Sequence, residues 1–173
     1  MEGQPATLSL AERNANWVRS MYRGGRADAR ARRFARFWSR IFGWGLAPRR
    51  WVTLEVPGYR TGKLVRVPLG MARVGDSWFL GSMLGECNWV RNVRAAGGDA
   101  VLRHGRARAV HLTELPAADR PAILKAYLTQ VPGARPHIPV GWQRPVDEFE
   151  AIAADFPVFR VADRRSSRGL PAQ

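Results

Sequence analysis

The sequence has a single cysteine, Cys87, among its 173 residues. One cysteine cannot form an intrachain disulfide, and it excludes a zinc site built from several cysteines. A reducing compartment fits this usage, so a cytoplasmic location is expected. The N-terminal segment lacks the basic and apolar regions of a secretory signal. No run of about eighteen apolar residues occurs, so no transmembrane span is expected.

Histidines and common catalytic signatures are also scarce. The three histidines are His104, His111 and His137, and none has a partner at metal-ligand spacing, so no metal site is expected. The dinucleotide-binding, P-loop, nucleophile-elbow and zinc-protease motifs are all missing. The chemistry must therefore come from another arrangement of residues.

Basic residues, in contrast, are abundant. Lysine and arginine number 28 against 14 acidic residues, which gives a net charge of +14, and only Lys63 and Lys125 are lysines. Such a charge favours acidic partners, namely nucleic acid, anionic lipid, or a phosphorylated or carboxylated small molecule. A nucleic-acid-binding module would interleave aromatic and basic residues along a sheet, whereas here the basic residues are scattered. Nucleic acid is therefore not expected as a partner, and such a module remains the lesser alternative.

The hydrophobic pattern predicts an α+β fold with a small barrel of about six mostly antiparallel strands and flanking helices. The expected strands are 51–56, 63–74, 77–82, 99–104, 106–115 and 157–162, and the expected helices are 86–96, 116–130 and one that ends at 155. An N-terminal helical segment, 1–50, precedes the barrel domain, 51–162, and residues 163–173 form a tail with the composition of a disordered segment.

A basic amphipathic helix is predicted over residues 26–42. Its apolar face consists of Phe34, Phe37, Trp38, Ile41 and Phe42, while five arginines lie largely on the other faces. One interpretation is that this face packs on the barrel or across a dimer interface. The other is that the helix lies on an anionic membrane surface, with its arginines against the headgroups.

Candidate site residues gather in three stretches. The turn and strand after Pro57 carry Arg60, Thr61, Gly62, Lys63 and Arg66; the strand end at 81–86 offers Ser82; and the following helix starts with Trp89 and Asn92. Cations, backbone N–H groups and a helix N-terminus can together hold an anion, and Trp89 offers a flat surface to a ring.

These stretches, VTLEVPGYRTGKLVRVPL, SWFLGSMLGE and NWVRNVRAAGG, resemble the deazaflavin-dependent nitroreductase family, which has a split β-barrel. The resemblance implies coenzyme F420, whose phosphate and oligoglutamate tail are anionic, and hydride transfer to a quinone, a nitroaromatic or another electron-poor small molecule. It places the tail against Arg60, Thr61, Gly62, Lys63 and Arg66, the ring against Pro68 and Leu69, and Ser82, Trp89 and Asn92 around the pocket.

Several alternatives stay open. Tyr59 and Val65 replace arginines that are frequent in the family, and related split barrels bind FMN, FAD or heme. A non-catalytic carrier of F420, flavin or heme would need the same pocket. No proton donor can be assigned, although Ser82 is a candidate by position and Tyr127 by chemistry. The resemblance also implies a homodimer.

Overall fold

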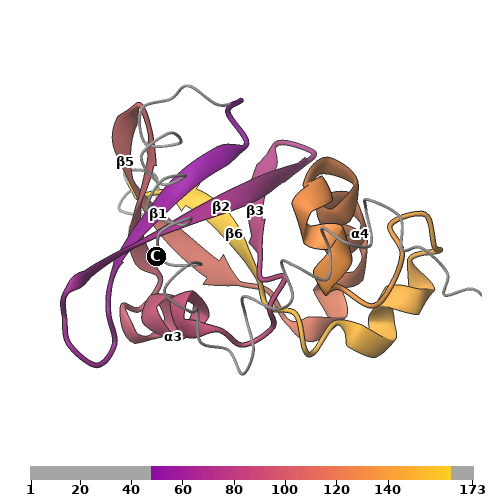
Figure 1. Cartoon of the computed structure of the whole chain (residues 1–173). Coiled ribbons are helices and arrows are strands. Elements are labelled where there is room, and N and C mark those ends of the chain that lie inside the picture. Colours follow the sequence, from indigo (N-terminus) through magenta and orange to yellow (C-terminus); the bar gives the residue numbers. More distant parts are fainter. Residues whose placement is uncertain (1–47, 165–173) are drawn as a thin grey trace, which may run out of the picture.

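A computed structural model describes residues 48–164, in which six strands form a closed antiparallel barrel (Figure 1). The strands are β1 (Trp51–Pro57), β2 (Leu64–Val74), β3 (Ser77–Gly81), β4 (Asp99–His104), β5 (Arg106–Glu114) and β6 (Val158–Asp163). Around the barrel they follow the order β1-β2-β3-β6-β5-β4, and β4 closes it by pairing with β1. This architecture confirms the predicted α+β barrel.

The helices are shorter than the hydrophobic pattern predicts. They are α3 (Asn88–Ala95), η2 (Ala117–Asp119), α4 (Pro121–Gln130), η3 (Pro132–His137) and η4 (Asp147–Ile152). The helix expected over 116–130 is divided because α4 begins with Pro121, whose ring suits the first turn of a helix but not its interior. The helix expected to end at 155 is a short 3-10 segment that ends at Ile152.

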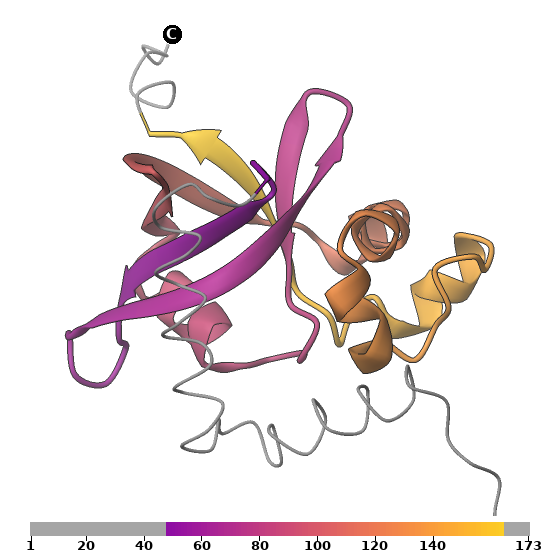
Figure 2. The ribbon, with the colours of Figure 1, turned by 45° about the horizontal axis from the view of Figure 1, so that its top comes forward.

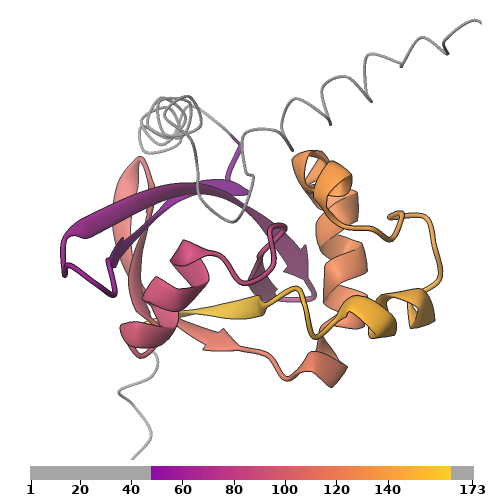
Figure 3. The ribbon, with the colours of Figure 1, turned by 60° about the horizontal axis from the view of Figure 1, so that its bottom comes forward.

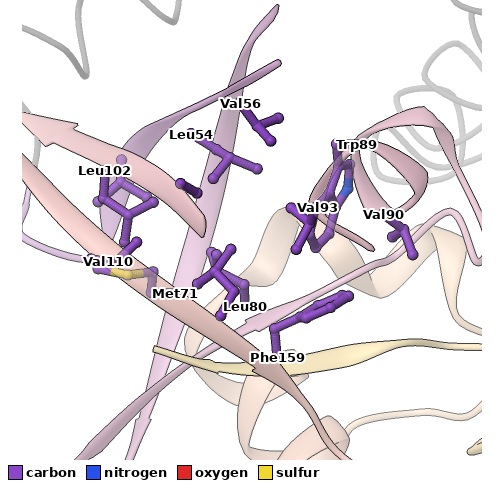
Figure 4. Packing of buried hydrophobic residues seen from close by; sticks show 13 residues of the cluster. Leu54, Val56, Met71, Leu80, Trp89, Val90, Val93, Leu102, Val110 and Phe159 are labelled. Atoms are coloured by element: carbon purple, nitrogen blue, oxygen red, sulfur yellow. The ribbon is translucent and has the colours of Figure 1, made fainter. Parts of the chain in front are cut away.

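The barrel encloses the main core, and α3 lies across one of its open ends (Figure 3). Leu54 and Val56 of β1 point into the barrel, where they meet Leu80 and Phe159 from the opposite side (Figure 4). Trp89 and Val93 extend this core from α3. Successive side chains of a strand point to opposite faces, so Thr53 and Glu55, the sequence neighbours of Leu54, lie on the outer face of β1.

A second core lies outside the barrel, where α4, η3 and η4 gather on one side (Figure 2). Here α4 packs closely on β2 and β3. A Cβ atom at Gly70 would lie 2.7 Å from a methyl carbon of Val131, and one at Gly81 would lie 3.1 Å from the ring of Tyr127. Glycine at these two positions lets the helix approach the sheet.

Two expectations concern residues outside the described range. Residues 1–47 of the predicted N-terminal helical segment, including the helix predicted over 26–42, lie outside it, and so do residues 165–173 of the predicted tail. The proposed domain boundaries therefore stay predictions. Within residues 48–164, no helix is long and apolar enough to cross a membrane.

Candidate cofactor site

The turn between β1 and β2 is held in one conformation by its own backbone. The N–H of Gly58 donates to the carbonyl of Lys63 at 2.8 Å, and the N–H of Gly62 donates to the carbonyl of Gly58 at the same distance. Gly62 has a φ of 65°, a backbone angle that residues with a Cβ atom rarely adopt. The glycine pattern that bounds this turn in the sequence therefore corresponds to a tight, internally bonded loop.

This turn is also anchored to α3, which lies beside it at the same end of the barrel (Figure 1). The side-chain oxygen of Asn92 accepts a hydrogen bond from the N–H of Tyr59 at 3.0 Å. Thr61 accepts one from the N–H of Lys63 at 3.3 Å. Most N–H groups of the turn are thus already satisfied, so an anion at the turn would be held by side chains rather than by a backbone cradle.

Two cations at this turn project into solvent. Arg60 and Lys63 are exposed, and neither has an acidic partner within residues 48–164. The guanidinium of Arg60 lies over the ring of Tyr59, 5.2 Å from its centroid. Two neighbouring positive charges that lack an acidic partner in this part of the chain form a suitable site for a phosphate or carboxylate.

Arg66, the third predicted cation, has a different environment. Its Nε donates to Oε1 of Glu55 at 2.8 Å, and Arg103 on β4 donates to both oxygens of the same carboxylate at 3.2 and 3.3 Å. Burial raises the pKa of Glu55, but the hydrogen bonds from Arg103 and Arg66 outweigh it and hold that pKa below its usual range. Glu55 is therefore an ionised carboxylate between two arginines.

Three other predicted residues are buried and engaged within the protein. Ser82 donates from Oγ to the carbonyl of Gly85 at 2.5 Å, and Asn92 holds the turn as described. Trp89 is only 7% exposed and packs against Phe159 with ring centroids 5.4 Å apart. Their direct contact with a cofactor stays a prediction, while their contacts with the protein fix the loop and helix beside the turn.

The residues predicted to line the ring lie on opposite faces of β2. Leu69 pairs with Val52 and packs against the barrel core, whereas Pro68 pairs with Thr53 on the outer face. Both are half-buried. A planar ring on the outer face would therefore contact Pro68 but not Leu69.

Tyr127, the candidate proton donor suggested by its chemistry, lies on α4 in the second core. It is 2% exposed and its ring covers Gly81. Burial raises the pKa of Tyr127 above its ordinary value, and the neighbouring Cys87 adds to the rise. Its observed surroundings are those of a packing residue, and its role in proton transfer stays a prediction.

Sequence reasoning did not single out Glu55 or Arg103. Glu55 is the one charged residue of the strand WVTLEVP, and a buried carboxylate in such a strand needs a cationic partner. That signal was available in the sequence, but the identity of the partners depends on the pairing of β1 with both β2 and β4.

Comparison with solved structures shows similar barrels. A protein of unknown function from Agrobacterium tumefaciens is 12% identical with a TM-score of 0.50, over 72% of this chain and 53% of that one. This chain thus spans about half the length of that protein, and the likeness supports the fold.

Two further structures are similar at lower scores. An F420-H2 dependent reductase is 20% identical with a TM-score of 0.45, over 66% of this chain and 95% of that one. An FAD-binding protein from Mesorhizobium loti is 18% identical with a TM-score of 0.44, over 73% and 89% of the two chains. No curated protein matches.

The family comparison is more specific. The model of the F420H(2)-dependent quinone reductase family matches residues 29–137, which include the turn, Glu55 and the whole of α3. It confirms the resemblance to deazaflavin-dependent oxidoreductases, and F420 is the cofactor for which that family is named. The chain belongs to the F420H2-dependent quinone reductase family.

Proposed function

We propose that this protein is an F420H2-dependent reductase that transfers a hydride to a quinone or a similar electron-poor small molecule. The observation that carries the proposal is the family match over residues 29–137, which spans the cationic turn and the helix that anchors it. Bound reduced F420 supplies the hydride, and the protein supplies binding, orientation and exclusion of water.

The residues at the turn fit an anionic cofactor. Arg60 and Lys63 are exposed and have no acidic partner in the described part of the chain, so their charges are available to a phosphate or a glutamate carboxylate. The hydrogen bonds within the turn and the bond from Tyr59 to Asn92 fix the loop that carries both side chains. A loop already ordered loses little conformational entropy when it binds an anion.

Beyond the turn, the buried residues serve as a scaffold in this proposal. Ser82 orders the loop from the end of β3 to α3, and Asn92 joins α3 to the turn. Trp89 fixes α3 to the barrel through Phe159. Pro68 is the predicted ring contact that lies on the outer face of β2, and it would lie beneath a planar ring.

The remaining expectations belong to the same proposal. The acceptor is a small molecule, and the protein acts as an enzyme rather than as a carrier of F420. Homodimer formation, a cytoplasmic location and contact of residues 26–42 with an anionic membrane stay predictions.

The test is a titration of the purified full-length protein with F420, FMN, FAD and heme at one ionic strength. We expect F420 to bind most tightly and its affinity to fall with added salt, because its phosphate and tail are anionic. Tighter binding of FMN, FAD or heme than of F420 would refute the cofactor assignment. If F420 binds but F420H2 is oxidised by no quinone or nitroaromatic acceptor, the carrier alternative is correct.

A further inference from the structure

Glu55 occupies an unusual position for a carboxylate. It lies in the middle of β1 on the face that points away from the barrel core, yet it is only 6% exposed. A carboxylate removed from water is costly unless cations or hydrogen-bond donors replace the lost solvent. Its partners therefore indicate why it is tolerated there.

Two arginines from different strands meet at this carboxylate. Arg66 stands directly opposite Glu55 on β2, and Arg103 reaches it from β4 on the other side. Both Nε groups share Oε1, at 2.8 and 3.2 Å, while one Nη of Arg103 contacts Oε2 at 3.3 Å. Glu55 thus fixes two guanidinium groups side by side on the outer face of three strands.

This arrangement leaves donors available. Arg66 donates only through its Nε, so neither of its Nη groups has an acceptor within residues 48–164. One Nη of Arg103 likewise has no acceptor among these residues. The two arginine side chains remain 59% and 39% exposed. One negative charge between two positive charges leaves a net charge of +1, directed toward solvent.

The triad also lies close to the cationic turn. Arg66 follows Lys63 by three residues, which corresponds to about 10 Å along a strand. An extended anion with several charges, such as a phosphate followed by glutamate carboxylates, spans a distance of this size. A compact anion would reach only one of the two places.

We propose that Glu55 is a positioning residue that orients Arg66 and Arg103 toward the anionic tail of the cofactor. The inference rests on the proposed function and extends it, because the cationic surface then continues from the turn onto the outer face of β1, β2 and β4. Glu55 itself does not touch the cofactor; it acts through the two guanidinium groups.

A purely stabilising role explains the geometry less well. The buried carboxylate needs a counter-charge, but Arg103 alone already donates to both of its oxygens, so stabilisation does not require Arg66 as well. Engagement through Nε, in contrast, leaves both Nη groups of Arg66 as donors, and such a pair can bind a carboxylate or phosphate with two hydrogen bonds.

The experiment compares four forms of the full-length protein: the parent, Glu55→Ala, Arg66→Ala/Arg103→Ala, and the triple variant. Each is titrated with F420 and with a deazaflavin that lacks the phosphate and the tail. Glu55→Ala should weaken F420 about tenfold, the size expected when a charge-assisted contact is lost. It should leave binding of the tail-less compound within twofold, and it should weaken F420 no further once both arginines are absent.

The matched control is Asp76→Ala, which removes a carboxylate of the same charge from an exposed ion pair with Arg73 at the β2–β3 turn. It should leave both affinities unchanged. If Glu55→Ala unfolds, Glu55→Gln keeps the side-chain volume and answers the same question, with the same loss of F420 affinity expected.

The experiment distinguishes failure of the proposed function from failure of the positioning role of Glu55. If the parent does not bind F420, the proposed function is wrong and this inference falls with it. If the parent binds F420 and Arg60→Ala/Lys63→Ala weakens it, but the Glu55 variants bind equally well or more tightly, the positioning role alone is refuted. Equal losses for F420 and the tail-less compound would likewise contradict it, since a general structural defect would explain them.

Discussion

The charges at the β1–β2 turn provide the most direct mutational test, through Arg60→Ala/Lys63→Ala. Both side chains are exposed and neither forms an ion pair within residues 48–164, so their loss should leave the folded state nearly as stable as before. Lys63 contributes its backbone carbonyl to the turn, and alanine keeps that bond. The effect of the double variant should therefore fall on binding.

Its size follows from the chemistry of the contacts. A hydrogen bond to a charged group contributes about 1.5 to 3 kcal/mol, so two of them together correspond to a loss of F420 affinity of at least about a hundredfold. The salt dependence of binding should also decrease, because fewer charge pairs remain to be screened. Titration at several salt concentrations measures both quantities, and thermal unfolding provides the stability control.

A matched control removes the same number and kind of charges elsewhere. Arg106→Ala/Lys125→Ala takes one arginine from the β4–β5 hairpin and one lysine from α4. The hairpin lies beyond the Trp51 end of β1, since His104 contacts the Trp51 carbonyl, whereas the turn lies at the Pro57 end. Unchanged affinity in the turn variant, or an equal loss in the control, would refute the assignment of the tail site.

Three further results are expected. Asn92→Ala should lower the unfolding free energy by about 1 to 3 kcal/mol in urea denaturation, because the partly buried N–H of Tyr59 loses its acceptor, and an unchanged midpoint would contradict this. Tyr127→Phe should keep the turnover rate within about twofold, since the ring packs in the second core; a loss of about a hundredfold or more would identify Tyr127 as a general acid. Glu55→Gln should reduce stability at pH 7, and the difference from the parent should shrink as the pH falls below about 4.5, because a carboxylate whose folded pKa is lowered loses its stabilising contribution as it becomes protonated. A difference that does not change with pH would contradict the ion triad.

The strands of the barrel were predictable because their signals are local. Alternating apolar residues between glycine-containing turns placed all six strand starts within one residue of the observed ones, as for β4, which begins at Asp99 as expected. The helices after β5 were harder, because Pro121 and the packing of α4 on β2 decide where they begin and end. Packing of this kind joins residues far apart in the chain.

In the candidate site, too, local features were predictable and contacts between distant residues were not. The turn with Arg60, Thr61 and Lys63 was identified from its own sequence, and its conformation depends on hydrogen bonds within a few residues. The bond between Asn92 and the turn joins positions 33 residues apart, and the contact of Arg103 with Glu55 joins positions 48 apart. The sequence motifs identified candidate site residues, but only the closed barrel shows which of their side chains remain available to a ligand.

The central claim is tested most directly by steady-state oxidation of F420H2 by the full-length protein with a quinone acceptor. The measurement follows the return of the absorbance of oxidised F420, with the protein, the acceptor or both omitted as controls. The account predicts oxidation that requires both the protein and the quinone and that saturates with F420H2. Oxidation no faster than without protein, while the protein is folded and binds F420, would contradict the proposed reductase activity.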